Sequence, residues 1–275
     1  MAHYSNWISQ QFGRFASKTF TPWFQKIINR TYVRLMDLEM CEFERAESYQ
    51  SLNALFTRHL KAPRTFSSDA SDMIAPCDAL VSERAQIDGA LAMQIKGMHY
   101  NVDALLGTEI DEASRKRVRG GDYINFYLSP RDYHRYHIPC DTQILKAVYI
   151  PGKLYPVNMP ALRNIASLFV ENERVVLECE SAGKRFFMVM VGALNVGKMQ
   201  IAFEPQIQTN ATVDTVQCYT YENLWQSKGD DFGCFEMGST IVILSEKGLF
   251  EYQVSCGEKV RYGETIATIA AADQA

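Results

Sequence analysis

The sequence lacks the cysteine spacing that a metal cluster or a disulfide framework would need. Its seven cysteines are scattered, with no Cys-x-x-Cys pair, which argues against both and favours a reducing compartment. Long apolar runs are missing as well, since the longest, residues 186–197, is shorter than the roughly 20 residues of a transmembrane helix. The N-terminus also has no continuous apolar segment of the kind found in secretion signals. We therefore expect a protein that is not integral to a membrane.

Acidic residues are absent from the beginning of the chain, although the whole chain has a formal net charge of -4. The first acidic residue is Asp37. The basic residues that precede it are Arg14, Lys18, Lys26, Arg30 and Arg34. A basic, aromatic-rich N-terminus on an acidic protein indicates a local contact with something anionic. The net charge gives no reason to expect nucleic acid as that partner.

This basic region is predicted to form two helices. Trp7, Phe12 and Phe15 recur at helical spacing, and a second amphipathic stretch begins after Pro22 with its basic residues in one stripe. Two interpretations remain open. The helices either pack on the core with a solvated basic face, or lie in a membrane interface with aromatic rings in the headgroup boundary and basic residues on anionic lipid.

The remaining chain predicts an α+β fold, with N-terminal helices followed by a mostly antiparallel β core. A third helical stretch is expected over residues 41–60, and from Met73 onward short β-like runs alternate with turn residues. Helices are also expected over residues 101–106 and 159–168. We divide the chain into an N-terminal helical segment, 1–62, and a β-rich domain, 63–275. The final strands alternate with turn glycines, as in the half-barrels of lipoyl-type modules: Val254, Gly257, Val260, Gly263, Ile266, Ala267 and Ile269.

One polar segment, Tyr127 to Pro139, follows an apolar strand and contains His134 and His137, two of the five histidines. A His-x-x-His pair in this position is compatible with structural, catalytic or metal-binding roles. Metal binding is the poorest fit, because no further histidine or cysteine lies nearby at ligand spacing.

A second small polar segment is Gly238-Ser239-Thr240, which opens a predicted buried strand. It is either a turn or a site of self-processing. In the latter case the Ser239 hydroxyl attacks the preceding carbonyl, and glycine at 238 removes the Cβ that would block that approach. A base must then take the hydroxyl proton, and a carboxylate would orient the base.

Together, these two segments resemble the motifs of bacterial phosphatidylserine decarboxylases, which are pyruvoyl-dependent lyases. The resemblance extends from about Tyr49 to Ile269. Other matching stretches are Pro76-Cys77-Asp78, Lys96-Gly97 to Tyr100, Ala104-Leu105-Leu106, Pro151-Gly152, Val157-Asn158, Leu168-Phe169 and Asn172-Glu173-Arg174.

The resemblance implies an Asp78, His137 and Ser239 triad that cleaves the chain between Gly238 and Ser239. The products would be a β chain, 1–238, and an α chain, 239–275, whose first residue becomes the covalent pyruvoyl cofactor. Phosphatidylserine would form a Schiff base with it and lose CO2 to give phosphatidylethanolamine.

The resemblance also assigns further roles at this site. His134 would handle a proton near the substrate carboxylate, with His137 as its rival. Arg131 and Arg135 would bind the lipid phosphate or the carboxylate, or else are ordinary ion-pair arginines. No metal ion is implied.

Two departures from the family pattern concern Ala79, where relatives usually have glycine, and Met98, where they often have histidine. The first change keeps the turn if φ is negative. The second leaves the role of the relatives' histidine in doubt, so the adjacent His99 is excluded from the catalytic residues.

A lipid substrate implies a peripheral protein on the cytoplasmic side of the cell membrane, docked on anionic lipid through residues 1–62, and the family implies a homodimer. The alternatives are a pyruvoyl decarboxylase of a soluble amino acid and a non-enzymatic lipid-binding relative.

Overall fold

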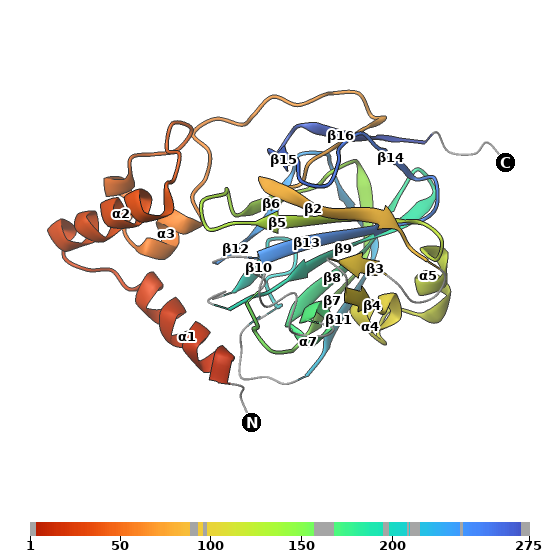
Figure 1. Ribbon diagram of the computed structural model, residues 1–275, viewed down its shortest axis with the longest axis horizontal. Helices are drawn as coiled ribbons and strands as arrows, with labels where there is room; N and C mark the ends of the chain where they lie inside the picture. Colours follow the sequence, from red (N-terminus) through yellow and green to blue (C-terminus); the bar gives the residue numbers. More distant parts are fainter. Residues whose placement is uncertain are drawn as a thin grey trace.

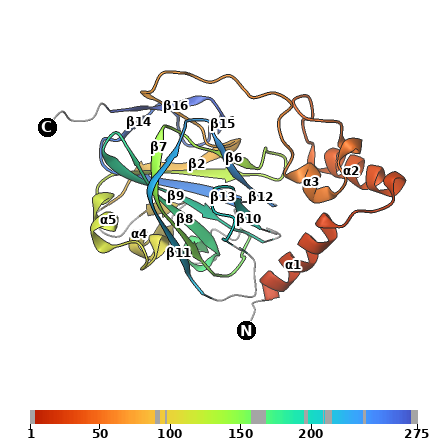
Figure 2. The same cartoon turned by 180° about the vertical axis from the view of Figure 1, so that it is seen from behind.

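The computed structural model describes residues 4–88, 93–95, 98–156, 168–194, 198–207, 209, 215–236 and 239–270. The N-terminal helical elements lie together at one end of the molecule, beside a large sheet (Figures 1 and 2). They are α1 (Tyr4–Ser17), α2 (Pro22–Met36), the 3-10 turn η1 (Ala46–Ser48) and α3 (Leu52–Phe56). None of the described helices combines the length and apolar character needed to cross a membrane.

The main sheet has eight antiparallel strands, in the order β11-β7-β8-β9-β13-β5-β2-β15. Their bounds in chain order are β2 (Ala79–Gln86), β5 (Asp122–Leu128), β7 (Thr142–Ile150), β8 (Arg174–Ser181), β9 (Lys184–Val191), β11 (Gln217–Gln226), β13 (Ser239–Ser245) and β15 (Lys259–Val260).

Smaller sheets and short helices cover this sheet. One small sheet has the order β10-β12-β6, a second β1-β16-β14, and a third pairs β3 with β4. The bounds are β1 (Asp72–Ile74), β3 (Met93–Ile95), β4 (Met98–Tyr100), β6 (Arg135–His137), β10 (Met199–Ile201), β12 (Asp231–Phe235), β14 (Phe250–Tyr252), β16 (Thr265–Ile269), α4 (Val102–Leu106), α5 (Glu112–Arg117) and α7 (Leu168–Glu171).

Strand β13 lies inside the protein and is covered on both faces. Ile241 and Ile243 pack into the cluster shared with the small sheets, whereas Val242 and Leu244 pack into the cluster shared with α4 and α7. Because successive side chains of a strand point to opposite faces, a continuous apolar run is what a two-sided core requires. This explains the sequence of β13.

Helix α2 presents polar residues to the protein and large apolar residues to solvent. Gln25, Asn29 and Tyr32 are buried, and the Asn29 amide donates to the carbonyls of Ala46 and Tyr49 at 2.8 and 2.9 Å. This is the reverse of the usual orientation of an amphipathic helix on a soluble protein.

The predicted α+β class and the antiparallel core are confirmed. The helix predicted over residues 41–60 is wrong in extent, because Ser51 has an extended backbone and caps α3 by accepting from the Ala54 N–H at 3.0 Å. The helix expected over 101–106 is present as α4, with Asn101 as its cap.

Other expectations stay open. Most of the helix expected over 159–168 lies outside the described residues. The likeness to a lipoyl half-barrel stays a prediction, since β15 joins the large sheet while β14 and β16 pair with one another and β1. The division of the chain at residue 62 also remains a prediction.

Candidate active site

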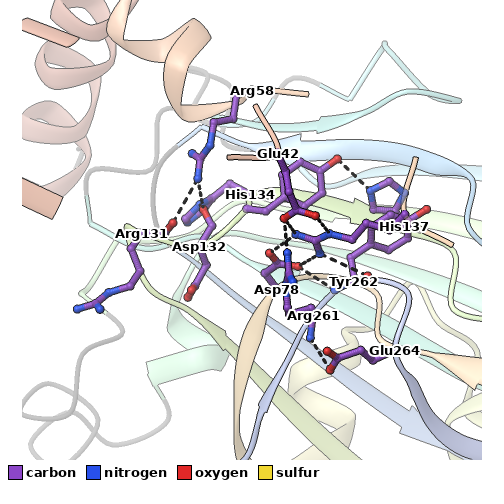
Figure 3. A network of polar contacts seen from close by, with 12 residues as sticks. Glu42, Arg58, Asp78, Arg131, Asp132, His134, His137, Arg261, Tyr262 and Glu264 are labelled. Carbon is purple, nitrogen blue, oxygen red and sulfur yellow. Dashed lines mark hydrogen bonds and ion pairs between the residues drawn. The ribbon is translucent and has the colours of Figure 1, made fainter. Parts of the chain in front are cut away.

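A polar cavity of about 540 Å³ lies where the N-terminal segment, the ends of β2 and β5, and the C-terminal segment meet. Asp78 and Asp132 line it together with Arg64, Tyr133 and Lys259. Figure 3 shows the polar network along its wall.

Asp78 precedes β2 and accepts three well-directed hydrogen bonds. The Arg64 guanidinium donates to both of its carboxylate oxygens, at 2.5 and 2.9 Å, and the Tyr262 backbone N–H donates at 2.8 Å. The Arg64 side chain is only 11% exposed and also pairs with Glu42 at 2.9 Å. The hydrogen bonds that Arg64 donates to Glu42 lower the pKa of Glu42. The Asp78 carboxylate is therefore held in place by the Arg64 guanidinium and the Tyr262 backbone N–H.

His137 lies in β6 with both ring nitrogens engaged. Its Nδ1 is 2.9 Å from the Gly229 carbonyl oxygen, and its Nε2 is 3.2 Å from the Tyr133 hydroxyl. Because a carbonyl only accepts, Nδ1 carries the proton and Nε2 presents the lone pair. Burial lowers the pKa of His137 to about 4. The ring is therefore neutral near pH 7 and can act as a base.

Asp78 and His137 are connected through Tyr262 rather than by a direct hydrogen bond. The Tyr262 ring stacks on His137 with a centroid distance of 3.5 Å and an interplanar angle of 13°. The position at Nδ1 where the sequence predicted a carboxylate is held by the Gly229 carbonyl. The expected orienting role of Asp78 is therefore indirect in this structure.

His134 is fully buried against the ring of Phe56, with a centroid distance of 4.0 Å. Its Nδ1 donates to the Asp132 carbonyl at 2.8 Å, and its Nε2 has no hydrogen-bond partner among the described residues. Burial lowers the pKa of His134 to about 3. An unpaired, buried lone pair is unusual for a purely structural histidine.

Ser239 opens β13, and its backbone pairs with Leu128 of β5. Gly238 and the Ser239 side chain lie outside the described parts of the structure. Nearby, β12 ends at Phe235, whose N–H donates to the His134 carbonyl at 2.9 Å. His137 is paired with Asp231 at the other end of β12. Along the described backbone, His134 is thus nearer than His137 to the junction between β12 and β13.

The two predicted headgroup arginines lie in different environments. Arg135 forms a bidentate ion pair with Asp231, at 2.5 and 3.0 Å, and its side chain is 13% exposed. Arg131 lines the cavity and is 53% exposed, with Asp37 at 3.8 Å as its ion-pair partner. The ion-pair alternative therefore describes Arg135, which links β6 to β12, while Arg131 is exposed and has only a long ion pair at the surface.

The departures from the family pattern have different outcomes. Ala79 is absent from the described non-glycine residues with positive φ, so the condition for keeping the turn is met. The side chains of Met98 and His99 lie outside the described residues. Within the described part of the chain, no His, Cys, Asp and Glu cluster has an arrangement that could hold a metal ion.

Sequence reasoning missed Arg58, Arg64, Tyr133 and Tyr262. The Arg58 side chain is buried under the Phe43 ring, 4.3 Å from its centroid, and donates to the Arg131 carbonyl at 3.2 Å. A buried arginine needs such partners, but no local pattern identifies them. Only Tyr133 had a signal, because it directly precedes His134 in the polar segment singled out from the sequence.

Comparison with known proteins assigns the chain to a class, the decarboxylating lyases. A family model described as phosphatidylserine decarboxylase matches residues 52–268. The chain belongs to the phosphatidylserine decarboxylase family.

Three relatives illustrate the similarity. A phosphatidylserine decarboxylase proenzyme of Helicobacter pylori is 48% identical over 97% of this chain and 98% of its own length. One from Campylobacter jejuni is 44% identical, covering 94% and 97%. One from Coxiella burnetii is 32% identical, covering 90% and 88%.

Proposed function

We propose that this chain is a proenzyme that cleaves itself between Gly238 and Ser239 and then converts phosphatidylserine to phosphatidylethanolamine and CO2. The observation that carries the proposal is the start of β13 at Ser239, beside the strand end from which the histidine segment departs. Two buried, neutral histidines in that segment supply bases, and the family membership supplies the reaction class.

Self-cleavage would proceed in four steps: acyl shift, elimination, addition of water and loss of ammonia. The Ser239 hydroxyl gives its proton to a histidine and attacks the Gly238 carbonyl, and the peptide C–N bond breaks to leave an ester and a free amine. Elimination then releases the Gly238 carboxylate and leaves dehydroalanine at position 239. Addition of water and loss of ammonia give the pyruvoyl group. His137 is the proposed base, because its Nε2 lone pair faces a hydroxyl donor and its Nδ1 is fixed.

The strand arrangement suits such a cut. Strand β12 is held between β10 and β6, and β13 is held between β9 and β5. The strands before and after the cut would therefore each stay hydrogen-bonded to two neighbouring strands that remain intact. The Thr240 hydroxyl is within hydrogen-bond distance of the Phe126 carbonyl, at 2.8 Å, and of Asn125 Oδ1, at 3.1 Å. These contacts would fix the new N-terminus of the α chain.

A pyruvoyl group at position 239 would supply an electron sink for the carbanion that loss of CO2 leaves on the substrate. The residues of this chain bind, orient and move protons around it. His134 is the proposed proton carrier for the substrate carbon, because its buried Nε2 has no partner among the described residues. Asp78, clamped by Arg64, holds Tyr262 against His137.

Helices α1 and α2 are the proposed docking surface for anionic membrane on the cytoplasmic side. Of the nine exposed large apolar side chains found among the described residues, seven are on these two helices: Trp7, Phe15, Trp23, Phe24, Ile27, Leu35 and Met36. Polar residues of α2 are buried instead. Asp37 follows α2 directly and lines the cavity, so a docked α2 would bring the cavity to the headgroups.

The decisive test is Ser239→Ala. The unmodified chain should give two bands on a denaturing gel, the smaller without a free N-terminal amine and reactive toward carbonyl reagents. Ser239→Ala should give one chain and no decarboxylation. Ser245→Ala is the matched control, a serine at the other end of β13, and should still cleave. A single band from the unmodified chain would overturn the proposed processing.

The two histidines should separate the two reactions. His137→Ala should block cleavage, whereas His134→Ala should cleave and then decarboxylate about a hundredfold more slowly or worse, the usual range for loss of an acid–base group. Assays on free serine and on phosphatidylserine vesicles should show turnover of the lipid alone. Normal turnover by cleaved His134→Ala would contradict its role.

We also expect a homodimer, which sedimentation equilibrium would test.

A further inference from the structure

Five cationic side chains line the cavity, and three of them are already committed. Arg64 is saturated by Asp78 and Glu42, and Arg261 is hydrogen-bonded to Glu42. Arg58 is buried under an aromatic ring with its two terminal nitrogens on backbone carbonyls. Recruiting any of these for a ligand would leave a partly buried carboxylate or carbonyl without its partner.

The other two cations, Lys259 and Arg131, are available. Lys259 lies on β15 and is exposed; within the described residues its ammonium makes no ion pair or hydrogen bond. Arg131 has Asp37 at 3.8 Å, and that carboxylate is 89% exposed. Such a surface pair contributes little and is readily exchanged. Figure 3 shows the Arg131 side chain extending away from the saturated network.

The strand register relates Lys259 to the predicted reaction centre. Lys259 pairs with Leu80, Leu80 with Tyr127, and Tyr127 with Thr240, which follows Ser239. Three strand spacings of about 4.8 Å put the Lys259 backbone about 14 Å from that of Thr240. Arg131 lies three residues beyond Leu128, the partner of Ser239. Both cations therefore flank the end of the sheet where β13 begins.

This separation is within the combined reach of an extended lysine side chain and a phosphoserine headgroup. An extended lysine side chain reaches about 6 Å, and the bonds from the headgroup nitrogen to its phosphorus span about 5 Å. Together with a contact of about 3 Å to a phosphate oxygen, these lengths add up to about 14 Å. The substrate carboxylate is bonded to the same carbon as the amine, so it stays nearer residue 239 and is the poorer match.

On the basis of the function proposed above, we propose that Lys259 and Arg131 form the binding site for the phosphodiester of the lipid headgroup. Arg131 belongs to the large product of the cut and Lys259 to the small one, so the headgroup would bridge the two chains. Arg135, held by Asp231, takes no part. The cations bind the phosphate and are not needed for processing.

Kinetics on phosphatidylserine in mixed micelles test this site. Lys259→Gln and Arg131→Gln should each raise KM about tenfold, as expected for loss of a charge-assisted hydrogen bond, with kcat within twofold. Self-cleavage should be unchanged on a gel, and Lys259→Arg should restore KM. Lys247→Gln is the matched control, an exposed lysine of the same small chain in the turn between β13 and β14.

Binding without turnover provides a second measurement. In the uncleaved Ser239→Ala protein, calorimetric titration with glycerophosphoserine should show about tenfold weaker binding for each variant and no change for Lys247→Gln. If cleavage and decarboxylation proceed but Lys259→Gln behaves as Lys247→Gln does, the phosphate site is wrong and the proposed function stands. An equal loss in all three variants would also overturn the site. If the unmodified protein neither cleaves nor decarboxylates, the proposed function itself fails.

Discussion

The two histidines of the site are kept neutral by burial rather than by a neighbouring charge. Desolvation is the largest cause of the lowered pKa of both His134 and His137. Their Nδ1 protons are held by the carbonyls of Asp132 and Gly229, so the tautomer is fixed with Nε2 as the basic atom. This arrangement suits bases that must be ready at neutral pH.

Burial of these histidines predicts a loss of stability in acid. Above pH 6.5 both histidines are neutral in the folded and the unfolded protein. Below pH 6.5 the unfolded chain binds protons, whereas in the folded protein His137 stays neutral down to about pH 4 and His134 down to about pH 3. The free energy of unfolding should fall across this window, by up to about 1.4 kcal/mol per pH unit for each histidine.

Urea denaturation of the uncleaved Ser239→Ala protein at pH 7, 6 and 5 would measure this dependence. Adding His134→Gln should remove about one proton from the slope. An unchanged slope in that variant would show that His134 is not the titrating group.

At this scale the sequence supplied candidate residues but not their contacts. Asp78, His134, His137 and Ser239 could be proposed from the sequence because each lies in a short, specific motif, and their roles stay predictions. Arg64 and Tyr262 were not, since they reach Asp78 from 14 and 184 residues away. Tyr262 follows β15 and reaches Asp78 only once β15 has paired with β2, which no local sequence pattern encodes.

At the scale of elements, α2 is the most informative helix. Its exposed apolar side chains include Trp23 and Ile27, while Asn29 is buried and hydrogen-bonded to η1 and to the Tyr49 carbonyl. The sequence predicted the helix and its basic stripe from periodicity alone. The sequence could not predict which face of α2 packs on the protein. The buried Asn29 amide is stabilised by the carbonyls of residues 46 and 49, which are brought to it only by the fold.

Point variants of α2 should therefore weaken membrane binding without unfolding the helix. Trp23→Ala is expected to reduce flotation with phosphatidylglycerol vesicles several-fold, because a large aromatic ring leaves the interface. Trp225→Ala is the matched control, a tryptophan equally exposed on β11, and should float normally. Deleting residues 1–29 should also weaken binding, although it removes Asn29 as well. Equal flotation of both tryptophan variants would contradict docking through α2.

Strands were easier to predict than helices in this chain. The buried run of β13 and the apolar residues of β9 are local signals that survive any tertiary arrangement. The expected helix over residues 41–60 failed because a single capping serine, Ser51, restarts the helix. Sheet order was not predictable, since neighbours such as β2 and β15 are joined by contacts across most of the chain.

At the scale of the molecule, the predicted cut divides a continuous sheet. Strand β13 would start the small chain, yet it pairs with β5 and β9 of the large chain along its length. After processing, both chains should elute together in size-exclusion chromatography and separate only in strong denaturant. Release of the small chain under native conditions would contradict this arrangement.

The position of β13 also bears on how the cell obtains working enzyme. The residues that meet at the start of β13 come from distant parts of the chain and assemble only when β5, β6 and β12 are in register. Under the proposed processing, a misfolded copy never acquires its reactive carbonyl and stays chemically inert. Formation of the cofactor would thus also act as quality control, because only a copy that has reached the native fold can form it.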